Sequence, residues 1–372
     1  MDTSLNLQKS SKFAPWRFEQ SEIAPNLLLM CKLLILIMIA YQYPIKLQDP
    51  YIPFIPALDY FNTIPGVFKS IVLSGFIVST LAIFCNIKIR IACLVLGIVI
   101  MLEQIASQPG FKNHVFVCGC FFILTSFTKK GEDYKLLFWQ LALIYLGAFI
   151  NKVLDPDWHS GAFMHNWLQN ARENSPYIFV SQLLPENWFA IILSYSALLS
   201  EGLLGILLFF KKYRKYTFWI ILLFHTVLYS FTAFRFGHFY DDLVIILLIF
   251  INWPQGIIQI NYKQSIKKIK NIHGLLDWDQ KFKWNVIDDS SNNWMELKTN
   301  EGETFKNYNA IRKLLISTPS FFIALFAFDC AVKFVFDGQE SVKHMINMPI
   351  VWALIIFFLP LLRYKNEKTE AN

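Results

Sequence analysis

The chain has 372 residues, of which 55% are hydrophobic, 17% are aromatic and only 16% are Asp, Glu, Lys or Arg. Soluble domains carry roughly 25% charged residues, and one soluble core could not bury 36 Phe and 11 Trp side chains, so the composition argues against a soluble protein. The net charge of +7 does not indicate a nucleic-acid partner, because the positive residues lie in short loops between apolar runs, where they set membrane topology. We expect an all-α polytopic membrane protein whose first partner is the lipid membrane.

Ten apolar runs predict membrane spans, since a helix needs roughly 20 residues to cross a bilayer. They predict about eight core transmembrane helices and two C-terminal helices, at residues 26–42, 67–86, 90–107, 112–127, 136–152, 188–210, 216–235, 238–253, 319–336 and 347–363. The fourth and eighth runs are short. Basic residues agree with the positive-inside rule at nearly every loop if both termini are cytoplasmic. Segment 153–187 is then external, with Arg172 as its one strong positive charge.

Residues 254–318 differ from the rest, being rich in Lys, Asp, Glu and Asn. Their pattern predicts strands at 256–262 and 281–287, helices at 263–276 and 307–318, and a hairpin at 294–305 that turns at Asn300–Gly302. We therefore predict three parts: a transmembrane core (1–253), a small α+β cytoplasmic insert (254–318), and two C-terminal transmembrane helices with a tail (319–372).

Ionisable residues inside the predicted spans are costly in lipid and therefore indicate a functional site. Glu201 and His225 fall near mid-membrane, and the others fall in the outer half: Glu103, His114, Lys152, Arg235, His238, Asp241 and Asp242. This distribution predicts one polar cavity that opens to the outside. Structural roles stay open as alternatives: a snorkelling Lys152, a buried Glu201–His225 pair, and carboxylates that start a helix and pair with Arg235.

Neither a metal site nor a disulfide framework is expected. His159 and His165 are six positions apart, which is not a helical metal spacing, and no third ligand is obvious. The six cysteines lie in or at the ends of apolar runs and form no CxxC pair, which is typical of packing residues.

One stretch, "YLGAFINKVLDPDWHSGAF" at residues 145–163, places Lys152 at the outer end of an apolar run, before Asp157, Trp158 and Gly161. The longer "LALIYLGAFINKVLDPDWHSGAFMHNWL" resembles the signature of the vitamin K-dependent γ-glutamyl carboxylase superfamily, also called the HTTM (horizontally transferred transmembrane) domain. Three further stretches resemble that family in the same order: "FKNHVFVCG" with Asn113–His114, "LLSEGLLGILLFFKKYR" with Glu201, and "LLFHTVLYSFTAFRFGHF" with His225. The resemblance covers roughly residues 10–253.

The resemblance implies catalytic roles for three residues. Lys152 is expected to be the base that deprotonates a quinol, His114 to assist carboxylation, and His225 to act with them. The supporting residues would be Asn113, Glu201, Asp157, Trp158, Arg235 and His238. A lysine at the rim of an apolar cavity is desolvated, which frees its lone pair near neutral pH.

The resemblance also implies the co-substrates. A reduced quinone (vitamin K hydroquinone or menaquinol) would be oxidised by O2 to an epoxide, and the strong base formed on the way would abstract a glutamate γ-proton, after which CO2 adds. The expected partner is a secreted peptide or protein, and the expected location is the bacterial cytoplasmic (inner) membrane.

Two features depart from the carboxylase pattern. The chain has the 254–318 insert in place of a large extracytoplasmic region, and the stretch after His225 reads "TVLYSF" where the family has an Asn-Ser pair. The insert is faintly similar to a degenerate DCC-type thioredoxin-like domain without cysteine. The resemblance as a whole implies an integral membrane enzyme that couples quinol oxidation to modification of a secreted peptide or protein at an outward-facing site.

Two alternatives stay open. One is a non-catalytic HTTM factor for the maturation or export of a secreted, bacteriocin-like peptide, as in the sporulation-delaying-protein system. The other is a transporter, which the one-sided placement of the polar residues and the lack of an inverted repeat disfavour.

Overall fold

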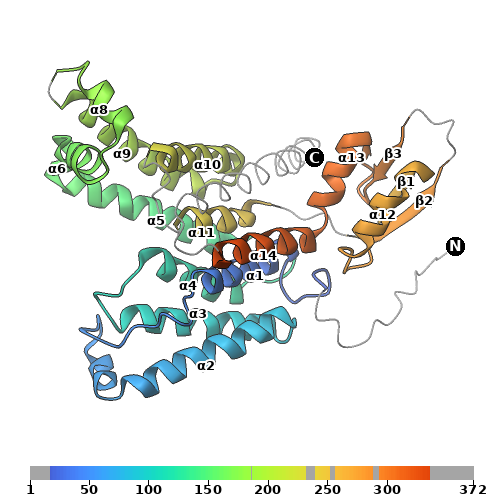
Figure 1. Ribbon diagram of the computed structural model, residues 1–372, viewed down its shortest axis with the longest axis horizontal. Helices are drawn as coiled ribbons and strands as arrows, with labels where there is room; N and C mark the ends of the chain where they lie inside the picture. The colour runs from blue at the N-terminus through green and yellow to red at the C-terminus, as the bar shows by residue number, and fades with distance from the viewer. Residues whose placement is uncertain (1–16, 186, 232–238, 252–255, 288–292, 336–372) are drawn as a thin grey trace. The chain divides into compact units, whose positions relative to one another are not determined.

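The computed structural model describes residues 17–185, 187–231, 239–251, 256–287 and 293–335 (Figure 1). Within them, helices occupy nine of the ten predicted span ranges: α1 (Pro25–Ala40), α2 (Pro65–Phe84), α3 (Ile89–Ile105), α4 (Asn113–Ser126), α5 (Lys135–Leu154), α9 (Trp188–Phe209), α10 (Arg214–Phe231), α11 (Phe239–Ile246) and α14 (Pro319–Val335). The tenth range, 347–363, lies outside the described residues. The fold is thus mostly helical, as predicted.

The predicted number of spans is not confirmed. Among the described residues, three helices are long and apolar enough to cross a membrane, namely α2, α5 and α9. A fourth span is possible if α13 (Asn307–Ile316) and the first part of α14, which meet at an angle of 77°, count as one broken span. The apolar helices α1 and α4 have 16 and 14 residues. At about 1.5 Å per residue they are shorter than the roughly 30 Å hydrocarbon core.

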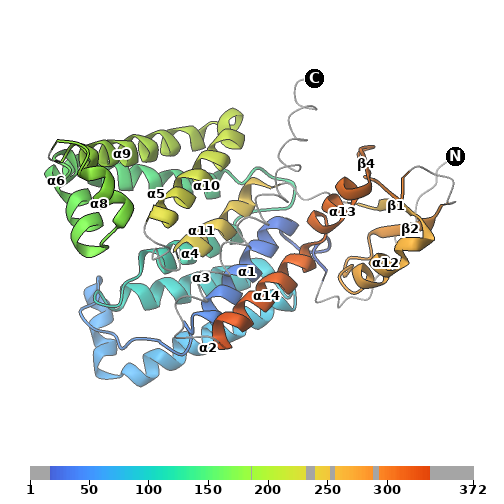
Figure 2. The ribbon, with the colours of Figure 1, turned by 45° about the horizontal axis from the view of Figure 1, so that its top comes forward.

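The chain forms two compact units, residues 1–132 together with 251–372, and residues 133–250. In the first unit α1 to α4 pack together, and α14 lies along α1 in both views (Figures 1 and 2). Pro25, Pro65 and Pro319 each start a helix at a position where the missing N–H costs nothing. The predicted division at residues 253 and 318 remains a prediction.

At one end of the first unit, residues 17–19 join segments that are distant in the sequence. The backbone carbonyls of Arg17 and Glu19 accept hydrogen bonds from Asn86, after α2, and from Lys130, after α4. The Glu19 carboxylate forms an ion pair of 3.5 Å with Lys281 of the insert. The charge pattern assigned these four segments to one side of the membrane. Their proximity agrees with that arrangement, while the identity of the side stays a prediction.

The insert is the predicted small α+β structure. Its four strands, in the order β2-β1-β3-β4, are β1 (Ile258–Tyr262), β2 (Phe282–Val286), β3 (Met295–Lys298) and β4 (Thr304–Lys306). Parallel β1 and β2 are connected through α12 (Lys267–Gly274), and β3 pairs antiparallel with β1 and with β4. Alternate strand residues such as Ile258 and Ile260 face a core that α13 covers with Leu314. The strand and helix predictions for this segment are therefore confirmed.

The second unit consists of α5, α9, α10 and α11, with a connection of short helices between α5 and α9. These are α6 (Pro156–His159), α7 (Ala162–His165), a π-helical turn (Asn166–Ala171) and α8 (Ser175–Ser181). Helices α5 and α9 run side by side in both views (Figures 1 and 2). Two glycines of α9 permit this close approach, because a Cβ on Gly205 would lie 2.6 Å from Leu146 and one on Gly202 would lie 3.0 Å from Phe149.

The packing of α3 on α4 gives a first prediction. A Cβ on Gly97 would lie 2.6 Å from the backbone carbonyl oxygen of Gly119, which cannot rotate away. We expect Gly97→Ala to destabilise the protein by about 1–3 kcal/mol through overpacking, seen as a lower Tm in detergent micelles. Gly147→Ala is the matched control, because no described atom lies within 4 Å of its Cβ position. Equal Tm values for Gly97→Ala and wild type would contradict the packing.

A second prediction concerns His273, which is buried in the insert. Thr318 Oγ1 donates to the Leu314 carbonyl at 2.7 Å, so it accepts from His273 Nε2 at 2.9 Å. Among the described residues Nδ1 has no partner, and a proton there would be buried without an acceptor. Burial, followed by the charge of Lys281, lowers the pKa of His273 to about 4.

The unfolded chain protonates His273 near pH 6.5, whereas the folded chain protonates it only near pH 4. The contribution of neutral His273 to the free energy of unfolding is therefore fully present above pH 6.5 and is lost as the pH falls toward 4. At pH 5 we expect a loss on the order of 2 kcal/mol relative to pH 7. His273→Gln keeps a donor for Thr318 and should show a smaller drop in Tm over the same interval. Parallel curves for the two proteins would exclude His273 as the titrating group.

Candidate functional site

The second unit holds an ion pair between Lys152, near the end of α5, and Glu201, in the middle of α9. Lys152 Nζ lies 2.6 Å from Glu201 Oε2, a short charge-assisted hydrogen bond. The two side chains are only 17% and 13% exposed. The glycine contacts that bring α5 against α9 set this register, since Gly202 and Gly205 meet residues one and two turns before Lys152.

The turn after α5 places an aromatic face beside this pair. The Asp155 side chain accepts a hydrogen bond from the Asp157 backbone N–H at 3.0 Å and so caps α6, with Pro156 at its first position. The capped turn directs Trp158 back over the end of α5, where its ring centroid lies 4.9 Å from Lys152 Nζ. Lys152 therefore contacts a carboxylate and an indole, and both contacts stabilise an ammonium group.

His159 fixes the same turn from its other side. Its Nε2 lies 2.7 Å from the Val153 carbonyl oxygen, which can only accept, so this nitrogen carries the proton. Nδ1 is then the acceptor for the Tyr195 hydroxyl of α9 at 3.2 Å. Gly161 completes the turn with φ +75, and a Cβ there would lie 2.8 Å from the Ile191 backbone nitrogen. Both the dihedral angle and the close approach require glycine at 161.

His225 lies deep in α10 and contacts α5. Its Nδ1 lies 3.0 Å from the Ile221 carbonyl oxygen and 3.5 Å from the Tyr145 hydroxyl. The carbonyl bond assigns the proton to Nδ1 and leaves Nε2 as the acceptor of the ring. Glu201 pairs with Lys152, and His225 contacts the Ile221 carbonyl. The two side chains therefore do not form the Glu201–His225 pair that the sequence left open.

The remaining predicted site residues lie elsewhere or are not described. Asn113 and His114 begin α4 in the first unit, where Glu103 accepts a hydrogen bond from Tyr43 at 3.1 Å. Since the two units are described separately, the predicted grouping of His114 with Lys152 and His225 stays a prediction. Buried Asp241 and Asp242 lie in the first turn of α11, and Arg235 and His238 lie outside the described residues.

Neither a cluster of metal ligands nor a disulfide is found among the described residues. In the described part of the chain, no three His, Cys, Asp or Glu side chains are arranged to hold a metal ion. Five cysteines are described and are free thiols, with Cys31 Sγ and Cys93 Sγ 3.8 Å apart in the core of the first unit.

Two tyrosines near the site were missed at the sequence level. Tyr145 lies two helical turns before Lys152, and this seven-residue spacing could have placed both on one face of α5. Tyr195 carries no such signal, because its partner His159 lies across a turn whose geometry depends on Gly161.

The ion pair gives a third prediction, in the form of a double-mutant cycle. Removing one partner leaves the other charge largely buried, so we expect Lys152→Met and Glu201→Gln each to cost about 1–3 kcal/mol. In the double variant no buried charge remains, and its loss in Tm should be clearly smaller than the sum of the single losses. Additive losses would show that the two side chains do not interact.

The comparisons with known proteins give one match. Residues 130–253 match the family model described as the HTTM domain. The comparisons with curated proteins and with solved structures found no match. The matched range nearly coincides with the second compact unit, residues 133–250, and contains Lys152, Glu201 and His225, while Asn113 and His114 lie before it. HTTM domains occur in vitamin K-dependent carboxylase-like proteins. We conclude that this chain carries an HTTM domain at residues 130–253.

Proposed function

We propose that the protein is an integral membrane enzyme of the vitamin K-dependent carboxylase type, with Lys152 as its base. The observation that supports this most directly is the Lys152–Glu201 pair, because it lies inside the HTTM match and joins two helices that are separated in the sequence. A reduced quinone would supply the electrons of the reaction when bound. The substrate would be a secreted peptide or protein reached from the outer side of the membrane.

Glu201 gives Lys152 a route to base function. An ammonium group cannot take up a proton, so Lys152 must first become a neutral amine. The Glu201 carboxylate, 2.6 Å from Nζ, is in position to accept the proton. In a desolvated site the neutral amine–acid pair competes with the ion pair because neither charge is well hydrated. A short proton shift from Lys152 to Glu201 would then leave a neutral amine, and rotation of that amine away from Glu201 would turn its lone pair toward a substrate hydroxyl.

Trp158 and its turn would orient the amine. The indole face near Nζ fixes the direction of the Lys152 side chain, and the α6 turn is held by its cap and by His159. A planar aromatic surface beside a proton acceptor also fits a planar quinol ring. Water exclusion at such a site protects reactive intermediates. His225, which contacts Tyr145 of α5, would act with Lys152 in the same unit.

The membrane placement is part of the proposal. The second unit contributes α5 and α9, two of the three helices in the described part of the chain that have the length and composition of a span. We infer a multi-pass protein of the bacterial inner membrane, with residues 17–19 and the insert on the cytoplasmic side. With α1 to α5 each crossing the bilayer, as the sequence predicts, the α5–α9 connection, including Trp158, would face outward.

A second candidate has an observation in its favour. The Lys152 ammonium group is satisfied by Glu201 and Trp158, as in a purely structural pair. A non-catalytic HTTM factor for the maturation or export of a secreted peptide would need no more than this.

A fourth prediction separates the two candidates. In proteoliposomes with O2 and CO2, we expect wild type to consume vitamin K hydroquinone or menaquinol, measured by chromatography of the extracted quinones. Lys152→Arg keeps a cation for Glu201, but guanidinium is not a base in proteins. We expect it to retain the wild-type Tm and to lose quinol consumption by roughly 100-fold or more, the usual scale for a missing general base.

Lys135→Ala is the matched control, since Lys135 is an exposed lysine at the other end of α5. It should consume quinol at the wild-type rate. Full activity of Lys152→Arg would exclude Lys152 as the base. Wild-type protein that neither consumes quinol nor yields a bound quinone on extraction would favour the non-catalytic factor.

A further inference from the structure

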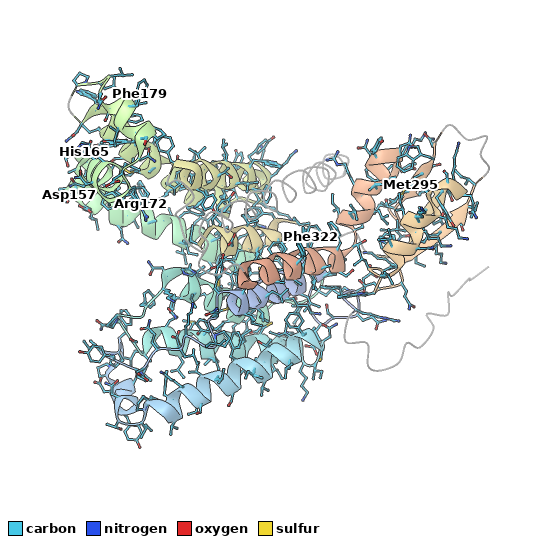
Figure 3. The ribbon with its side chains drawn as sticks, in the orientation of Figure 1. Asp157, His165, Arg172, Phe179, Met295 and Phe322 are labelled. Atoms are coloured by element: carbon cyan, nitrogen blue, oxygen red, sulfur yellow. The ribbon has the colours of Figure 1, made fainter. Side chains whose placement is uncertain are left out.

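An uncharged apolar stretch lies within the connection between α5 and α9. Residues 175–185, "SPYIFVSQLLP", comprise α8 and the residues after it, and none of them is Asp, Glu, Lys or Arg. Phe179 and Leu183 are 65% and 68% exposed, and Leu184 is 38% exposed. Figure 3 shows Phe179 on α8, with Asp157, His165 and Arg172 in the neighbouring segment. Polar loops rarely present such side chains together without a partner.

The other side of the stretch is firmly attached to the protein. Tyr177 is fully buried, stacks on Phe189 of α9 at 5.5 Å, and shares a hydrogen bond of 2.9 Å with His165 Nδ1. The Asn174 side chain caps α8 by accepting from the Tyr177 backbone N–H at 2.8 Å. The same side chain donates to the Phe231 carbonyl at the end of α10. With one face held in this way, Phe179 and Leu183 cannot turn inward.

The exposed face continues into the surface of a candidate span. Four residues after Leu184 the chain enters α9 at Trp188, which is 58% exposed. The exposed residues of α9 then follow at helical spacing, with Ile192, Leu199 and Leu203. A span turns such a stripe toward lipid, so Leu183 and Leu184 lie where this stripe meets the end of the span. Trp is the residue that most often marks that interface.

We propose that residues 175–185 insert into the headgroup–acyl boundary of the outer leaflet, with Phe179, Leu183 and Leu184 in contact with lipid. A segment apolar on both faces is expected to be covered on both, and here protein covers one face and lipid the other. The charged residues Arg172 and Glu173, just before the stretch, mark the point where the chain leaves the membrane interface for water. The segment serves as an interfacial anchor for the α5–α9 connection. This inference does not depend on the proposed enzymatic function.

Depth-dependent fluorescence quenching tests this placement. Leu183→Cys and Phe179→Cys are each labelled with a thiol-reactive bimane in phosphatidylcholine proteoliposomes. Asn170→Cys, at an exposed polar position of the same connection, is the matched control, and wild type treated identically supplies the blank for the native cysteines. The quenchers are 5-doxyl phosphatidylcholine in the bilayer and iodide on both sides of it.

We expect the labels at 179 and 183 to be quenched by doxyl lipid at least threefold more than the label at 170, and the order to reverse with iodide. Equal access of iodide to all three labels would place the stretch in water and overturn the inference. Labels at 179 and 183 that neither quencher reaches would overturn it as well, because a second copy or another protein would then cover this face. Only variants whose Tm matches that of wild type are used in this comparison, because they are correctly folded.

Discussion

The close approach of α5 and α9 is the constraint on which the HTTM-domain unit depends. Glycines at 202 and 205 let the helices meet at a distance that larger side chains would prevent, and that distance sets the register in which Lys152 faces Glu201. Two charges that would each be unfavourable in lipid are thereby paired within one structure. The turn with Asp155, Trp158 and Gly161 closes over the pair and adds an aromatic contact. Stability and proposed chemistry in this unit rest on the same few contacts.

Much of the secondary structure could be predicted from hydrophobic pattern alone. Apolar runs marked the positions of the described long helices, and alternation in residues 254–318 marked each of the four strands. The number of spans could not be predicted in the same way, because a run of apolar residues does not reveal where a helix ends. Tyr41 already ends α1 and Phe127 ends α4, so each is shorter than the bilayer core. Short irregular helices between α5 and α9 left no periodic signal.

The candidate site was predictable as a set of residues but not as a set of contacts. Lys152, Glu201 and His225 could be identified because ionisable side chains within apolar runs are unfavourable in lipid. Their pairing depends on helix register across 49 positions, which the glycine packing determines and the sequence pattern does not show. The structure joins Glu201 to Lys152 and gives His225 a backbone carbonyl and Tyr145 instead. Only Tyr145 had a usable signal, its seven-residue spacing from Lys152 on one helix.

The contact of residues 17–19 with the insert has a consequence for biogenesis. Phe18 donates its backbone N–H to Asp279, a partner 261 positions later in the chain. The HTTM-domain unit is continuous in sequence and can assemble before the insert has been translated. The first unit is instead built from two segments of the chain, residues 1–132 and 251–372. Residues 17–19 can form these contacts only after residues 279–281 have left the ribosome. Translation order therefore makes the first unit the last to be completed, and the surfaces of its early helices that later contact the C-terminal part stay exposed during synthesis.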